Sequence, residues 1–209
     1  MKFDQSFKDA IGRLPDKEKD KLLLRLLKKD IALAKQLHFQ LLESRSIDEL
    51  RAEVELSLKQ EITKRSNYFH SPGVLMMFLR EISGSINEHV STTKDKYGDP
   101  YLNCIMLIQA FNKNREQLNG RNLRETEKLY IYVVARIFKI LTQVNALHED
   151  LQYDFNALFE QLTEEMYQIP GLMKMLIYQG LDINWMLGNG IPEDIVTIQK
   201  NLRQRGYLK

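Results

Sequence analysis

Apolar residues recur along most of the chain at three- and four-residue spacings, which is the periodicity of an amphipathic α-helix. One such stripe runs from Leu75 to Val90 and another from Tyr130 to Val144. No stretch shows the strict apolar–polar alternation of a half-buried strand, and β-branched residues do not cluster between turn signals. The pattern therefore predicts an all-α protein.

Prolines and capping residues mark where the helices begin. Proline suits the first turn of a helix, because its missing N–H would have no partner there. The five prolines are Pro15, Pro72, Pro100, Pro170 and Pro192. Capping-box spacing is present at Ser46–Glu49 and at Asn122–Glu125. We expect about nine or ten helices, over residues 3–13, 15–28, 30–44, 47–66, 72–94, 100–118, 123–149, 152–169, 171–180 and 192–206.

The links between these helices are short, so neighbouring helices are expected to pack antiparallel as helical hairpins. Stacked hairpins form either a compact bundle or a short α–α superhelix, and no repeat of fixed length decides between them. Residues 101–111 are apolar on most sides, which predicts a central helix that others cover. We expect one domain over residues 1–209, with a flexible joint near 187–191.

Composition removes several kinds of site. The chain has 209 residues and a net charge of +2, and Cys104 is its only cysteine, so an intrachain disulfide and a zinc ribbon are excluded. No Glu-x-x-His pattern, phosphate-binding glycine loop or nucleophile elbow is present. We therefore expect no metal, no cofactor and no catalytic residues. The polar N-terminus and the lack of a long apolar run predict a cytoplasmic protein without a membrane segment.

Charge is unevenly spread along the chain. Residues 140–173 contain six acidic residues and no Lys or Arg, whereas residues 13–29 contain seven basic and three acidic residues. One interpretation is an acidic face that binds another protein or a second copy of the chain. Its candidate residues are Asp154, Glu160, Glu164 and Glu165. The alternative is a solvated helix face, or an acidic and a basic face that meet within one chain.

Methionines and aromatic residues gather in two places, Met76–Phe78 and Met173–Trp185. Such residues form adaptable binding grooves in some proteins. At helical spacing they are more often part of the core.

The C-terminal segment locally resembles the second half of a winged helix-turn-helix, with a helix at 192–206. In that interpretation the residues facing a major groove or phosphates are Thr197, Lys200, Asn201 and Arg203. Glu193 and Asp194 oppose it, because they would repel phosphates at the helix start. Gly206 has a simpler role as the glycine that ends the helix, with Tyr207 and Leu208 folding back to pack.

Three functional hypotheses follow. The first is a non-catalytic protein-interaction or scaffold module, and the second is a nucleic-acid-binding regulator that uses the C-terminal helix. The third is a ligand-binding protein or enzyme with a pocket between helices, which a buried polar cluster of Asn103, Tyr130 and Arg136 would favour.

Overall fold

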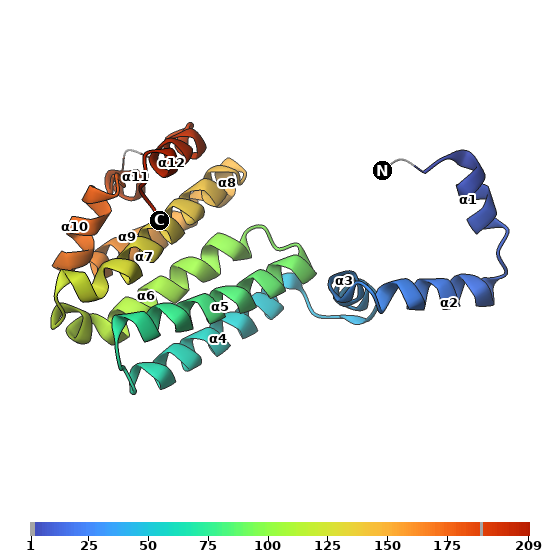
Figure 1. Cartoon of the computed structure of the whole chain (residues 1–209), viewed down its shortest axis with the longest axis horizontal. Coiled ribbons are helices and arrows are strands. Elements are labelled where there is room, and N and C mark those ends of the chain that lie inside the picture. The colour runs from blue at the N-terminus through green and yellow to red at the C-terminus, as the bar shows by residue number, and fades with distance from the viewer. Residues whose placement is uncertain (1–2, 189) are drawn as a thin grey trace. The chain divides into compact units, whose positions relative to one another are not determined.

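A computed structural model describes residues 3–188 and 190–209, and within these residues it contains helices and no strand. The predicted all-α fold is confirmed (Figure 1). The helices are α1 (Gln5–Gly12), α2 (Asp16–Leu27), α3 (Ile31–Leu42), α4 (Ile47–Ser66), α5 (Pro72–Thr93), α6 (Gly98–Asn119), α7 (Leu123–Asn145), α8 (Glu149–Tyr153), α9 (Phe155–Tyr167), α10 (Pro170–Tyr178), α11 (Asn184–Leu187) and α12 (Ile195–Gln204).

The chain divides into two compact units. One consists of Met1–Ser44 with Ser91–Thr93, and the other of Arg45–Val90 with Lys94–Lys209. The single domain expected over residues 1–209 stays a prediction. The flexible joint predicted near 187–191 includes Asn189, which lies outside the described residues.

The N-terminal unit contains α1, α2 and α3, and none of the residues in these helices is buried. Each of α1 and α3 begins at an aspartate whose side chain accepts a backbone N–H, Asp4 from Phe7 and Asp30 from Leu33. The large apolar side chains of this unit that are exposed are Phe3, Phe7, Ile11, Leu23, Leu24, Leu26, Ile31, Leu33, Leu41 and Leu42.

The second unit has a continuous core built around α6. This helix packs against α4, α7 and α9, and α7 packs in turn against α10 and α12. Residues 102–107 of α6 are all buried, which confirms the predicted helix that is covered on most sides. The hydroxyl of Tyr132 on α7 lies 3.0 Å from Ser83 Oγ and 3.3 Å from Leu79 O, so α5 is held to α7 through this group.

Most predicted helix ends are confirmed by their caps. Both capping boxes are formed, at Ser46–Glu49 and at Asn122–Glu125. Gly206 has φ +95 and ends α12, where the Tyr207 N–H donates to Leu202 O, and Leu208 is buried as expected.

Four boundaries were wrong. The helix expected from Pro100 begins at Gly98, because Asp99 is buried and bonded inside the helix instead of capping it. The helix expected at 152–169 is split at Asp154 into α8 and α9, and the preceding helix, expected to reach 149, ends at Asn145. The short helix α11 was not expected. The helix predicted at 192–206 begins only at Ile195, because Pro192 precedes a turn.

Candidate apolar binding pocket

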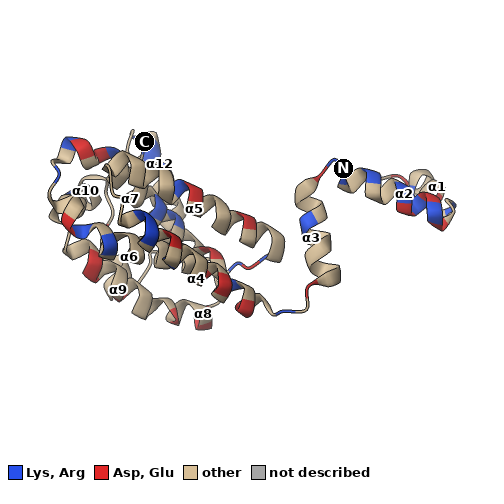
Figure 2. Ribbon diagram, turned by 90° about the horizontal axis from the view of Figure 1, so that it is seen from below, with Lys and Arg blue, Asp and Glu red and all other residues tan. Residues whose placement is uncertain are grey.

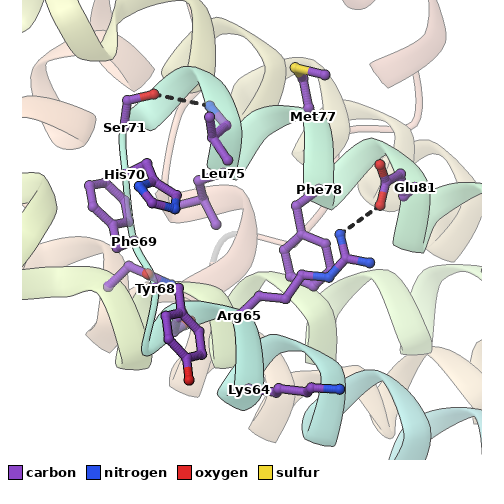
Figure 3. A pocket seen from close by; sticks show the side chains of 13 residues that line it. Lys64, Arg65, Tyr68, Phe69, His70, Ser71, Leu75, Met77, Phe78 and Glu81 are labelled. Carbon is purple, nitrogen blue, oxygen red and sulfur yellow. Dashed lines mark hydrogen bonds and ion pairs between the residues drawn. The ribbon is translucent and has the colours of Figure 1, made fainter.

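A pocket of about 350 Å³ lies where α4 ends, the chain turns through residues 67–71 and α5 begins (Figure 3). We call it the corner pocket. Its apolar lining is formed by the side chains of Tyr68, Phe69, Val74, Leu75, Met77 and Phe78. A volume of this order suits one large side chain or a small ligand.

The local sequence dictates this turn. The Tyr68 N–H donates to Arg65 O at 3.0 Å, which closes the end of α4. Ser71 then caps α5, because its Oγ accepts the Val74 N–H at 3.3 Å, and Pro72 occupies the first turn. Most of the residues that line the pocket therefore lie at the end of α4, in the turn or at the start of α5. Hydrogen bonds to the backbone hold both of these helix ends.

The pocket has a buried base and an exposed rim. Leu75 and Phe78 are 7% and 5% exposed and belong to the core. Tyr68, Val74 and Met77 are 73%, 48% and 61% exposed. Exposed apolar side chains that continue into a concave apolar surface are typical of binding sites.

Charged groups stand at one edge of the pocket. Arg65 donates to Glu81 at 2.7 Å and to Glu61 at 3.2 Å, and its guanidinium carbon lies 4.2 Å from the centroid of the Phe78 ring. Hydrogen bonding to Glu81 raises the pKa of Arg65 above its usual value. These bonds tether the guanidinium over the Phe78 ring at the pocket edge, as Figure 3 shows. Lys64 and His70 are exposed beside it.

One residue beside the pocket comes from α6 and has no exposed surface. Asn114 is fully buried, and its Nδ2 donates to Ala110 O and to Ser66 Oγ, both at 2.8 Å. A backbone carbonyl only accepts, so the atom facing Ala110 O is the nitrogen and the amide orientation is fixed. Within the described residues, Asn114 Oδ1 is buried and accepts no hydrogen bond. The corner pocket thus combines a buried apolar base with charged and polar residues at its edge.

The acidic residues predicted as a protein-binding face differ in their exposure. Asp154, Glu160 and Glu164 are exposed, and the last two lie one turn apart on α9. Figure 2 shows where acidic and basic residues lie along the helices. Glu165 is half-buried and accepts from Asn112 on α6 at 2.9 Å. Glu160 also lines a cleft of about 520 Å³ with Glu149, Tyr153 and Trp185. Their role in binding stays a prediction.

The residues predicted for nucleic-acid binding share the outer side of α12. Thr197, Lys200, Asn201 and Arg203 are all exposed, and Ile195 is buried on the opposite side. Glu193 and Asp194 are exposed just before the helix. The role of this face stays a prediction.

The polar cluster of Asn103, Tyr130 and Arg136 that would have favoured a ligand-binding protein or enzyme is not formed, because each residue has its own surroundings. Asn103 Nδ2 donates to Asp99 at 2.8 Å, and Arg136 donates to the Tyr132 hydroxyl at 3.1 Å. Tyr130 is buried beside Gly171. The third hypothesis therefore loses the cluster that would have favoured it.

A buried ion pair that the sequence did not reveal joins α4 to the start of α6. Arg51 donates twice to Asp95, at 2.7 and 2.8 Å, and the Gly98 N–H donates to the same carboxylate at 2.8 Å. Burial alone would raise the pKa of Asp95, but hydrogen bonds from His89, Arg51 and Gly98 outweigh it and hold the pKa well below its usual range. Every group in this network has a protein partner, so we assign it a structural role.

The described residues show neither a reactive cysteine nor a metal-binding group. Cys104 is buried, and burial raises the pKa of its thiol far above the usual value, so it is not a nucleophile. In the described part of the chain, no group of three His, Cys, Asp or Glu side chains is placed to hold a metal ion. No helix among the described residues is long and apolar enough to cross a membrane.

The corner pocket was only partly visible in the sequence. Met77 and Phe78 stood out as a Met–aromatic segment, but core packing was the preferred interpretation. Tyr68 and Asn114 carried no signal, because the pocket draws its residues from two helix ends and from a third helix about 40 residues further along. Comparison of the chain with protein families, with curated proteins and with solved structures found no match, so its function is argued from geometry alone.

Proposed function

We propose that this protein is a non-catalytic protein-interaction module whose corner pocket takes an apolar segment of a partner polypeptide. The observation that carries the proposal is the continuity of a buried apolar base with an exposed apolar rim, on helices anchored in a core. Binding energy in protein interfaces concentrates in such desolvated pockets, while the surrounding contacts exclude water.

The character of the lining favours a polypeptide over nucleic acid. Phosphate binding needs several uncompensated cations, whereas Arg65 at the pocket edge is bonded to Glu61 and Glu81. Tyr68 and Met77 lie on the rim, and both residue types are enriched in protein interfaces.

The exposed apolar side chains of α1, α2 and α3 add support from another part of the chain. An amphipathic helix is stable when its apolar side is buried against another surface. These three helices bury no residue, so their apolar sides suit contact with a protein.

Site-specific photo-crosslinking in the native cell compares the three candidate surfaces. A photoreactive phenylalanine would replace Val74 in the corner pocket, Glu160 on the acidic face or Lys200 on α12, one position at a time. We expect a discrete product from position 74 in which the crosslinked residue lies in an apolar segment of the partner. That product should disappear when Met77→Arg is added and persist when Glu164→Lys is added.

Two outcomes contradict the proposal. A discrete product from position 160 or 200, with none from 74, moves the interaction to the acidic face or to α12. A product from position 74 that survives Met77→Arg shows that the label reports proximity and not occupation of the pocket.

A further inference from the structure

The cleft of about 520 Å³ that Glu160 lines shares no lining residue with the corner pocket. Most of its lining comes from α8, α9 and α11, and we call it the acidic cleft. We propose that it binds a lysine or arginine side chain from a basic segment of a partner polypeptide. This inference adds a second contact surface and does not rest on the occupation of the corner pocket.

The base of the acidic cleft belongs to the core of the second unit. Val144, Phe159 and Met186 line it and are buried. Trp185 is half-buried beside them, and the centroid of its ring lies 6.1 Å from that of Phe138 in an edge-on arrangement. Core packing therefore holds the indole, while part of Trp185 stays accessible.

Two acidic residues line the same cleft. Glu149 on α8 and Glu160 on α9 are exposed, and neither forms a hydrogen bond or an ion pair with another described residue. No Lys or Arg is among the described residues that line the cleft. Residues 140–199 contain nine acidic residues and one basic residue, Lys174, which is not part of the lining. The charge of this region therefore favours a cationic group.

The aromatic residues of the cleft add a second preference for a cation. Tyr153 is largely exposed and Trp185 is half-buried, and both line the cleft. Lysine and arginine bind to the faces of such rings, tryptophan being the best partner. The aliphatic stem of either side chain also packs along apolar surface, here Val144 and Phe159, while its charge stays near water.

Other kinds of side chain fit the acidic cleft less well. A purely apolar side chain would desolvate Glu149 and Glu160 without giving them a partner, which is costly. An acidic segment or a nucleic acid would be repelled by the same two residues, because neither carries a cation of its own. A long side chain that ends in a positive charge satisfies both the apolar base and the acidic lining.

The test uses two blocked peptides that differ in charge. One has three arginines separated by alanines, and the other has citrulline, the neutral analogue of arginine, at the same positions. Each would be titrated into the full chain, following the fluorescence of Trp185, the only tryptophan of the sequence. We expect a saturable change with the arginine peptide and binding at least about tenfold weaker with the citrulline peptide, because the ion pairs and the cation–π contact are lost.

Variants of the lining test which residues bind the peptide. Glu149→Gln and Glu160→Gln together remove both charges and keep the size of the side chains. The double variant should bind the arginine peptide about tenfold more weakly than the natural chain. Glu164→Gln is the matched control, because Glu164 is exposed on α9 and does not line the cleft. At physiological ionic strength, which screens distant charges, it should bind as the natural chain does.

Four results overturn the inference. The first is unchanged Trp185 fluorescence throughout the titration, and the second is equal affinity for the two peptides or equal affinity of the natural chain and the double variant for the arginine peptide. The third is binding of spermidine as tight as that of the arginine peptide, because a free polyamine of the same charge is then the ligand.

The fourth result concerns a second copy of the chain. If dilution of the protein alone changes the Trp185 fluorescence, and the double variant abolishes that change, a second copy fills the cleft in place of another polypeptide. None of these results bears on the corner pocket, whose proposed function the crosslink from position 74 tests separately.

Discussion

The two compact units carry the same kind of sequence pattern and differ in what that pattern packs against. Both contain helices whose apolar residues recur at helical spacing. In α1, α2 and α3 none of these residues is buried, whereas α6 and α7 bury most of their apolar residues. The comparison shows that helical periodicity determines the secondary structure, while burial depends on what is available to cover each apolar side.

This difference in burial between the two units matters for function, because a preformed binding site needs side chains that are held in place by packing. The walls of the corner pocket include Leu75 and Phe78, which belong to the core of the second unit. Side chains held by such packing present a preformed surface, which reduces the entropy lost on binding. The N-terminal helices offer apolar side chains without that support.

The largest expected difference between the units is the response to a core truncation. Leu79 on α5 is fully buried, so Leu79→Ala should lower the free energy of unfolding by about 3 kcal/mol through lost burial and a cavity. Leu24 on α2 is 59% exposed, so Leu24→Ala should change it by less than about 0.5 kcal/mol. Urea unfolding followed by the fluorescence of Trp185 measures both. Equal losses of unfolding free energy from Leu79→Ala and Leu24→Ala would contradict the difference in packing between the two units.

A second contrast concerns ion pairs. Asp95→Asn should destabilise the protein by about 3 kcal/mol, because it removes the buried carboxylate that pairs with the half-buried Arg51 and leaves Arg51 only the exposed Asp48 as counter-charge. A Cβ at Gly98 would collide with the Asp95 carboxylate, so Gly98→Ala should also be destabilising. Asp16→Asn breaks an exposed pair with Lys19 and should leave the urea midpoint unchanged. A midpoint for Asp95→Asn as high as that of the natural chain would show that this network is not structural.

The same carboxylate predicts a pH dependence. Because the folded state lowers the pKa of Asp95, its contribution to stability is complete above the unfolded pKa of about 3.9 and is lost as the pH falls below it. The natural chain should therefore lose more free energy of unfolding than Asp95→Asn between pH 5 and the lowest pH at which both remain folded. Urea titrations at a series of pH values measure this difference, and parallel losses would refute it.

The smallest contrast concerns helix caps. Asn122→Ala removes the capping box of α7 and should lower the free energy of unfolding by about 1 kcal/mol. Asp30→Ala removes the cap of α3, whose residues are not buried. It should reduce the helical circular dichroism slightly and leave the unfolding transition seen by Trp185 unchanged. A shift of that transition by Asp30→Ala would mean that α3 stabilises the second unit.

The sequence was sufficient where the cause of the structure is local. Helical periodicity predicted the helices, and the side chains of Ser46 and Asn122 predicted the starts of two of them, because a cap depends on neighbouring backbone groups. The start of α6 was not predicted because Lys139 and Gln143, both on α7, donate hydrogen bonds to the Asp99 side chain. No local sequence pattern encodes such a contact between helices. The pocket was missed for the same reason, since Asn114 reaches it from another helix.

Hydrogen–deuterium exchange of the whole chain, measured for each peptide, tests most directly whether the corner pocket is a preformed site on the packed core of the second unit. The account predicts slow exchange in α6, in α7 and in the pocket segments at the end of α4 and in α5, with much faster exchange in α1, α2 and α3. Exchange at residues 60–66 and 75–82 as fast as in α1 would mean that the pocket is not preformed. Protection of α1, α2 and α3 equal to that of α6 would mean that their apolar sides are covered, and either result would contradict the account.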